Sequence, residues 1–328
     1  METFPAYLIT APGEGSVVDL TEDQLPNREF RVNVEYSALN YKDALAITGK
    51  APVLKEYPMV PGIDLIGTIL ESKFNMLSVG EYLIATGNGT GEKSSGGLAG
   101  IAHIRSAGIT QLPKRLTSRQ AAALGTAGLT AALCAVPILE KYPDFRELYS
   151  VLVTGATGGV GSIAVMLFSA LGYRVIAATG RAEFEDYLKG LGAAEVISRK
   201  DISIGDGPLE RNKRWGAVVD TVGGDTLAGA LKAISDDGIV TACGMAGGAK
   251  LNTTVYPFIL RGITLQGINS VDVSTEKRWR AWEMLSTYID RDKLDEITQE
   301  ITLSQLPEYA AKMLNNQTHG RIVVRPER

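Results

Sequence analysis

The stretch V-L-V-T-G-A-T-G-G-V-G-S, Val151 to Ser162, joins a short apolar run to a glycine-rich turn. Its glycines Gly155, Gly158 and Gly161 have the spacing G-x-x-G-x-x-G. The first glycine permits a tight turn, the second lets the backbone approach a pyrophosphate, and the third lets a helix pack closely on the strand. The free N–H groups and the positive end of that helix favour phosphate. The stretch therefore predicts a strand, a turn and a helix that bind a dinucleotide.

Strand and helix patterns alternate after this turn. The expected strands are 151–154, 174–179, 194–197, 216–220, 238–242 and 263–267. The expected helices are 159–171, 183–191, 226–234 and 276–288. Such alternation predicts a parallel sheet with both faces covered.

The first 115 or so residues have a different pattern, in which glycine and proline separate short alternating runs. The expected strands are 30–36, 62–71, 79–86 and 97–105. Short strands with frequent turns predict a partly open barrel or a sandwich. The C-terminal G-R-I-V-V-R-P predicts one more strand that returns to this domain, because the parallel sheet is already complete.

A helical stretch connects the two patterns. Thr117 or Ser118 is expected to cap it, a break is expected at Gly125–Gly128, and its second part is expected to end at Pro137. A chain of 328 residues is long enough for two domains. We expect an α/β fold in which residues 125–269 form a Rossmann-type domain and residues 1–124 with 270–328 form the β-rich domain.

Composition excludes several classes of protein. The net charge is −4 without a basic stripe, so a nucleic-acid surface is not expected. The sequence shows no run of about 18 apolar residues and no basic, apolar leader, so neither a membrane span nor secretion is expected. The only cysteines, Cys134 and Cys243, read as small buried side chains in a reducing cytoplasm. With His103 and His319 they form no metal-binding motif, and no metal site is expected.

The tip of the second strand indicates which cofactor binds. An NAD site places an acidic residue about 20 residues after the glycines, whereas Thr179-Gly180-Arg181 has an arginine there. A guanidinium binds a 2′-phosphate with two hydrogen bonds, so the sequence predicts NADPH. Arg199 and Lys200 either add a second cation or form a solvated surface.

Three classes of oxidoreductase carry such a turn. Short-chain dehydrogenases begin with it and need Tyr-x-x-x-Lys, which the cofactor half lacks. Zinc alcohol dehydrogenases have a comparable first domain but need cysteine and histidine ligands. The zinc-free branch of the medium-chain superfamily remains.

The chain resembles one family of that branch over essentially its whole length. The matching motifs are L-N-Y-K-D-A-L-A-I-T-G-K (39–50), Y-P-M-V-P-G-I-D (57–64), G-T-A-G-L-T-A (125–131), T-G-A-T-G-G-V-G-S (154–162) and P-F-I-L-R (257–261). They resemble the bacterial acrylyl-CoA reductases of the AcuI/YhdH/YhfP type, also labelled quinone oxidoreductases. The resemblance implies a GroES-like first domain and NADPH-dependent reduction of acryloyl-CoA to propionyl-CoA.

The resemblance also implies cofactor contacts throughout the chain. They are Tyr41, Thr130, Gly155, Thr157, Gly158, Gly159, Val160, Thr179, Gly180, Arg181, Arg199, Met245, Ile259, Ser270 and Asn315, with Asn316 as an alternative to Asn315. Relatives pair through the edge corresponding to 263–267, which implies a homodimer.

The reaction implied by the resemblance needs few groups. Hydride reaches the β-carbon of the enoyl thioester, charge grows on the thioester oxygen, and a proton must reach the α-carbon. Asn40 and Tyr41 are the catalytic candidates, since they occupy the stretch where zinc-dependent relatives place their first ligand. Tyr41 either donates the proton or only forms a wall against the nicotinamide, and water is the other donor.

Two other functions stay open. A quinone reductase would share the cofactor site and need no coenzyme A contacts. A non-enzymatic role is the other alternative, since zinc-free relatives resemble a lens crystallin that binds NADPH. Coenzyme A would need cations for its phosphates. The candidates are Lys50, Lys55, Lys93, Arg105 and Arg261.

Overall fold

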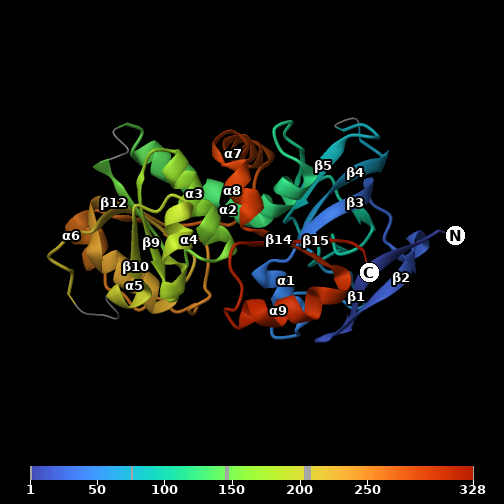
Figure 1. Cartoon of the computed structure of the whole chain (residues 1–328), viewed down its shortest axis with the longest axis horizontal. Coiled ribbons are helices and arrows are strands. Elements are labelled where there is room, and N and C mark those ends of the chain that lie inside the picture. Colours follow the sequence, from blue (N-terminus) through green and yellow to red (C-terminus); the bar gives the residue numbers. More distant parts are fainter. Residues whose placement is uncertain (1, 75–76, 145–147, 203–207, 328) are drawn as a thin grey trace. The chain divides into compact units, whose positions relative to one another are not determined.

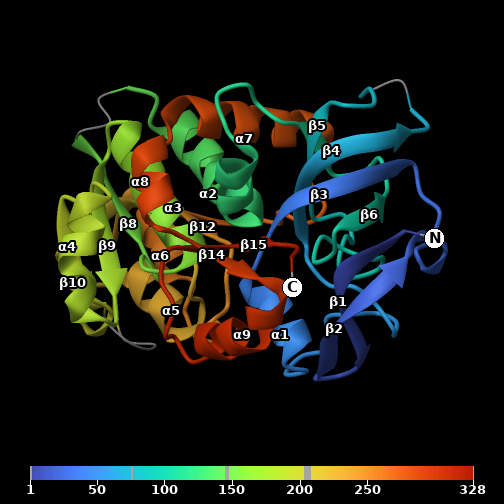
Figure 2. The same cartoon turned by 45° about the vertical axis from the view of Figure 1, so that its right-hand side comes forward.

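The structure is a computed structural model that describes residues 2–74, 77–144, 148–202 and 208–327. The backbone divides into two compact units. The first unit comprises 1–129, 270–287 and 291–328, and the second comprises 130–269 and 288–290. Figures 1 and 2 show the elements of both units along the chain.

The second unit contains one parallel sheet. Its strands are β8 (Ser150–Val153), β9 (Arg174–Thr179), β10 (Glu195–Ser198), β11 (Trp215–Asp220), β12 (Ile234–Ala242) and β13 (Thr264–Gly267). Their spatial order, β10-β9-β8-β11-β12-β13, is that of a doubly wound dinucleotide-binding sheet. The expected Rossmann-type sheet is confirmed, with β13 at one edge.

The helices of this unit follow its strands. They are α3 (Gly159–Ala170), α4 (Glu185–Gly190), α5 (Gly224–Ala233) and α6 (Tyr256–Arg261). The buried core joins both sheet and helices, with Leu152 and Val218 from the strands and Leu227 and Leu231 from α5. The expected strand 238–242 is shorter than the observed β12, which begins at Ile234 because α5 passes directly into it. Helix α6 was not expected.

The first unit is β-rich, as expected. One sheet has the order β14-β15-β3-β4-β5-β7, and β6 pairs with β3. These strands are β3 (Phe30–Ala38), β4 (Asp64–Ser72), β5 (Tyr82–Thr86), β6 (Ile101–Ile104), β7 (Ile109–Gln111), β14 (Thr298–Thr302) and β15 (Arg321–Arg325). Strand β15 pairs with β3, which confirms that the C-terminal strand returns to this unit. The hairpin β1 (Thr3–Ala11) and β2 (Glu14–Thr21) was not expected.

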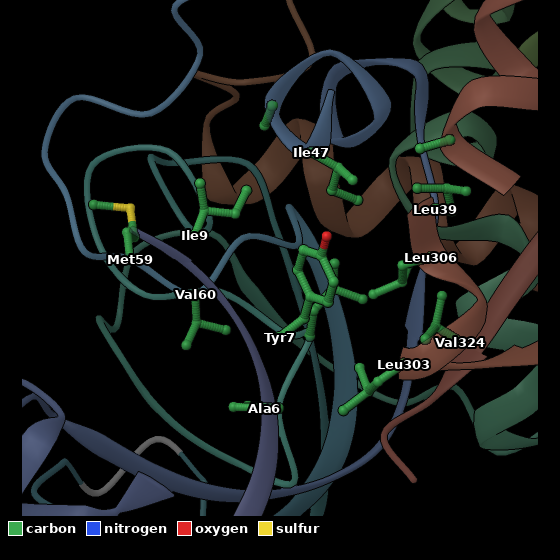
Figure 3. Close-up of a cluster of buried hydrophobic side chains, with 14 of the residues drawn as sticks. Ala6, Tyr7, Ile9, Leu39, Ile47, Met59, Val60, Leu303, Leu306 and Val324 are labelled. Carbon is green, nitrogen blue, oxygen red and sulfur yellow. The ribbon is translucent and has the colours of Figure 1, made fainter. Parts of the chain in front are cut away.

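The helices of the first unit are α1 (Tyr41–Ile47), α7 (Thr275–Tyr288), α8 (Arg291–Glu296) and α9 (Leu306–Leu314). Helices α1 and α9 pack against each other and share a core with β1 and β15. Figure 3 shows Tyr7, Ile9, Ile47, Leu306 and Val324 in this cluster. The core fixes the buried face of α1 and thereby the direction in which its first residue, Tyr41, projects.

Helix α2 (Ser118–Lys141) has a break where the sequence predicts one. Gly125 has φ 44° and ψ −145°, outside the helical region. Thr117 caps the start, because its hydroxyl accepts from the N–H of Gln120 at 3.1 Å. The expected end at Pro137 is wrong, since the helix continues to Lys141.

The sequence does contain one apolar run of the length that was not expected. An 18-residue window of α2 is long and apolar enough, by length and composition only, to cross a bilayer. However, 78% of that window is buried inside the structure, as in the core helices of globular proteins.

Candidate active site

The glycine-rich turn has the geometry that its sequence predicts. Gly155 has φ 58°, and a Cβ on Gly161 would lie only 2.3 Å from the carbonyl oxygen of Gly155. Gly158 is exposed and forms the N-cap of α3, which has 12 residues. Gly159 and Val160 begin that helix. The turn therefore presents the backbone of these residues to a ligand at the carboxyl end of β8.

Polar side chains fix the turn from below. Thr154 Oγ1 donates to Asp220 Oδ1 at 2.7 Å, and the N–H of Gly223 donates to Asp220 Oδ2 at 2.7 Å. Thr221 Oγ1 donates to the carbonyl of Thr154 at 2.8 Å. Burial raises the pKa of Asp220 above its ordinary value. Asp220 was not predicted as a site residue, although its place at the end of a parallel strand next to β8 was a usable signal.

The expected phosphate-binding residues lie together. Arg181 Nη2 donates to Thr157 Oγ1 at 2.6 Å, and the guanidinium lies 4.5 Å from the centre of the Phe184 ring. Partial burial lowers the pKa of Arg181, which nevertheless stays a cation at neutral pH. A Cβ on Gly180 would lie 3.3 Å from Nη2 of Arg199, so the second guanidinium reaches the same place. Two cations and a hydroxyl thus meet beside Thr179, and a phosphate monoester fits such a set.

The loop after β11 contacts the glycine turn, and the loop after β12 packs on the loop after β11. A Cβ on Gly155 would contact Thr221 Oγ1 at 2.4 Å, and one on Gly223 would lie 3.2 Å from Cα of Met245. Met245 and Ile259 are 71% and 72% exposed, respectively, which leaves both side chains accessible to a ligand. Thr130, by contrast, is buried within α2.

The two cysteines come together below this loop. Cys243 Sγ donates to the carbonyl of Asp220 at 3.4 Å. The neighbouring Cys134 thiol and burial raise the pKa of Cys243. A raised thiol pKa disfavours the reactive thiolate, so the two cysteines serve as packed side chains and not as reactive groups.

Asn40 and Tyr41 lie at the start of α1 in the first unit. Asn40 is the N-cap residue and is 9% exposed, whereas Tyr41 is 47% exposed. Asn40 Nδ2 donates to Asp64 Oδ2 at 2.8 Å, and Asn40 Oδ1 accepts from Arg321 Nη2 at 3.2 Å. Both ends of the Asn40 amide are therefore engaged, while the Tyr41 ring reaches solvent.

Asp64 is the centre of this buried network. Its Oδ2 also accepts from the N–H of Thr126 at 2.9 Å, and its Oδ1 accepts from the Thr126 hydroxyl. A Cβ on Gly125 would lie 2.3 Å from Asp64 Oδ2, so the carboxylate occupies the space left by the missing side chain. Burial raises the pKa of Asp64, against the opposing effect of these hydrogen bonds. The break in α2 exists because a carboxylate caps the helix that starts after it.

Asp43 links the start of α1 to the strand that follows. Its Oδ2 accepts from the N–H of Asn40 at 2.9 Å, and its Oδ1 accepts from the N–H of Ile63 at 3.0 Å. Burial raises the pKa of Asp43 to about 7. Asp43, Asp64 and Arg321 were not predicted as site residues, and no local pattern marks them.

The other expected contacts of the first unit lie on separate segments. Ser270 is half-buried, and the N–H of Asn88 donates to the carbonyl of the adjacent Val271 at 3.1 Å. Asn315 is exposed and forms the C-cap of α9. Its neighbour Asn316 has φ 58°, so Asn316 adopts the left-handed conformation that follows the helix and Asn315 does not.

One candidate for phosphate binding is wrong. Arg261 is 8% exposed, and its guanidinium donates to the carbonyls of Lys232, Ile234 and Glu210. A guanidinium that is hydrogen-bonded to three backbone carbonyls and buried belongs to the core and is not available to bind a ligand. In the part of the chain that the structure describes, no group of three or more His, Cys, Asp or Glu side chains is arranged to hold a metal ion.

The comparisons with known proteins agree with this architecture. Residues 26–137 match the family model for the alcohol dehydrogenase GroES-like domain, and residues 159–287 match that for the zinc-binding dehydrogenase. The acrylyl-CoA reductase AcuI of Ruegeria pomeroyi is 43% identical over 95% of this chain and 94% of its own.

Two solved structures are similar over nearly all of their length. Escherichia coli K-12 YhdH with bound NADPH superposes with TM-score 0.92 at 41% identity, covering 98% of this chain and 100% of that one. Bacillus subtilis yhfP with NAD bound superposes with TM-score 0.93 at 39% identity, and the match covers 99% of this chain and 100% of that one. The chain therefore belongs to the zinc-free medium-chain dehydrogenase/reductase family that contains the AcuI and YhdH acrylyl-CoA reductases and YhfP.

Proposed function

We propose that this protein reduces the carbon–carbon double bond of acryloyl-CoA to give propionyl-CoA, with NADPH as the reductant. The observation that carries the proposal is the match to the Ruegeria pomeroyi acrylyl-CoA reductase over 95% of the chain. The cofactor site alone would suit many reductions, so the assignment of acryloyl-CoA as the substrate depends on the similarity to this relative.

The second unit supports NADPH as the cofactor. Arg181, Thr157 and Arg199 gather at the tip of β9, and the glycine turn presents backbone N–H groups for the pyrophosphate. No acidic side chain occupies positions 179–182, where a carboxylate would repel a 2′-phosphate. When bound, NADPH supplies a hydride to the β-carbon of the acryloyl group.

The first unit supplies the groups that complete the reduction. Addition of hydride leaves negative charge on the thioester oxygen, and the α-carbon must then accept a proton. Tyr41 carries an exposed phenol that can give up this proton, which solvent then replaces. Asn40 has both ends of its amide engaged by Asp64 and Arg321, so its role in the proposal is to position Tyr41.

We further propose a cytoplasmic homodimer. The two cysteines are free thiols, in keeping with a reducing compartment. Strand β13 lies at the sheet edge, and α6 before it exposes Tyr256, Ile259 and Leu260 at 55%, 72% and 66%. An unpaired edge beside exposed apolar side chains favours pairing with a second copy.

The test is a substrate panel with NADPH, in which its absorbance loss is followed with acryloyl-CoA, crotonyl-CoA, quinones and aldehydes. The expected result is the highest kcat/KM for acryloyl-CoA. A higher kcat/KM for a quinone would make the protein a quinone reductase. Binding of NADPH without turnover of any compound would favour a non-enzymatic role.

A further inference from the structure

Three lysines of the first unit lie on segments that meet at one glutamate, Glu92. Lys42 Nζ lies 3.1 Å from Oε2 of Glu92, and the N–H of Lys55 donates to the carbonyl of Glu92 at 3.0 Å. Lys93 follows Glu92 in the chain, and both Lys55 and Lys93 are exposed. Among the described residues, no ion pair includes the ammonium group of Lys55 or Lys93. We name Lys42, Lys55 and Lys93 the Glu92 lysine cluster. The carboxylate of Glu92 balances one of the three positive charges of these lysines.

The backbone under the cluster is fixed. The N–H of Lys93 donates to the carbonyl of Gly89 at 2.7 Å, and that of Gly91 donates to the carbonyl of Ser94 at 2.8 Å. Gly91 has φ 66°, and a Cβ there would lie 2.5 Å from the backbone of Gly62. The backbone that carries Lys93 is therefore held in place, and the bond from the N–H of Lys55 to the carbonyl of Glu92 ties the segment of Lys55 to the same loop.

The cluster lies at the same end of β3 as Tyr41. Lys42 is adjacent to Tyr41 in α1, which follows the carboxyl end of β3. The opposite end of β3, at Phe30, pairs with Ile104 and Ser72. Eight residues of strand separate the two ends by roughly 25 Å. Arg105 and Lys73, which follow those partners, are therefore remote from Tyr41, although Arg105 was also a candidate for coenzyme A.

We propose that the Glu92 lysine cluster binds the phosphates of the coenzyme A thioester. This inference rests on the proposed reduction of acryloyl-CoA. The thioester brings several phosphate groups, and exposed ammonium groups bind phosphate as point charges. The 2′-phosphate of NADPH has cations of its own in the second unit, at Arg181 and Arg199.

The experiment compares acryloyl-CoA with acryloyl-N-acetylcysteamine, which keeps the thioester and has no phosphate. The double variant Lys55→Gln/Lys93→Gln removes both unpaired charges. The matched control Lys73→Gln/Arg105→Gln removes two charges at the far end of β3. In the cluster variant, the kcat/KM ratio of acryloyl-CoA to acryloyl-N-acetylcysteamine should fall by about tenfold or more, mainly through the KM for acryloyl-CoA. The control should keep the wild-type ratio.

The KM for NADPH separates the two sources of phosphate. A rise in that KM in the cluster variant, with an unchanged thioester ratio, would assign the lysines to the cofactor and overturn the inference. An unchanged ratio, or an equal fall in the control, would also overturn it while leaving acryloyl thioester reduction intact. If the wild type reduces neither thioester, the proposed function itself fails, independently of the variants.

Discussion

Replacing Arg181 with alanine should change the cofactor preference of this protein more than its turnover. The guanidinium lies 2.6 Å from Thr157 Oγ1 and stacks on Phe184, so it is already oriented before a ligand arrives. A charge-assisted hydrogen bond contributes about 1.5–3 kcal/mol, which corresponds to roughly 10- to 100-fold in affinity. The KM for NADPH should rise by about this factor, whereas the KM for NADH, which lacks the 2′-phosphate, should change little.

The assay measures kcat and KM with both cofactors at saturating acryloyl-CoA. Arg181→Lys should fall between wild type and alanine, because an ammonium keeps the charge and loses the planar fork and much of the stacking. Arg174→Ala is the matched control, since Arg174 begins the same strand and pairs with Glu195 at 2.8 Å. Equal rises in KM for NADPH and NADH, or an equal effect of Arg174→Ala, would refute the assignment of Arg181 to the 2′-phosphate.

Four further outcomes are expected. If Tyr41 donates the α-proton, Tyr41→Phe should lower kcat by about 100-fold or more with little change in NADPH affinity; near-normal kcat for Phe with a large loss for Tyr41→Ala would make Tyr41 a wall. Gly125→Ala should destabilise the protein by about 3 kcal/mol in urea unfolding, because the residue has φ 44° and its Cβ would meet Asp64; an unchanged midpoint would contradict the buried contact. Burial raises the pKa of Asp43 to about 7, so the folded protein favours the protonated carboxyl. The resulting contribution to stability is fully present below pH 4 and is lost as pH rises through 7. The variant Asp43→Asn should therefore show a flatter dependence of Tm on pH between 4 and 7, and curves parallel to the wild type would argue against the raised pKa. Light scattering at micromolar concentration should give the mass of two chains, and a monomer mass would exclude the dimer through β13.

Expectations that depended on short windows of sequence were the most successful. The turn at Gly155 and the break at Gly125 follow from positive φ values that glycine adopts readily, and Gly161 lies where a Cβ would meet the carbonyl of Gly155. The six parallel strands follow from apolar runs between turn signals. These features are local, because a glycine conformation or a hydrophobic period is encoded within a few residues.

Local patterns misjudged segments whose state depends on packing. Pro137 ends most helices in isolation, yet α2 continues past it to Lys141 because the helix is largely buried. Arg261 resembled a surface cation, but α6 turns it towards carbonyls of residues 27, 29 and 51 positions away along the chain. In both, tertiary contacts outweighed the local preference.

The sequence by itself determined the class of this protein: the glycine turn, the arginine after β9 and the missing metal motif follow from residue chemistry at short spacing. Only the tertiary structure decided how the start of α1 is held. Asn40, Asp64 and Arg321 come from a loop and two strands, and Asn40 and Arg321 are 281 positions apart in the chain. A buried carboxylate or guanidinium is tolerated only where distant segments bring it partners. No local pattern encodes that meeting, because it exists only once β3, β4, α2 and β15 have packed together.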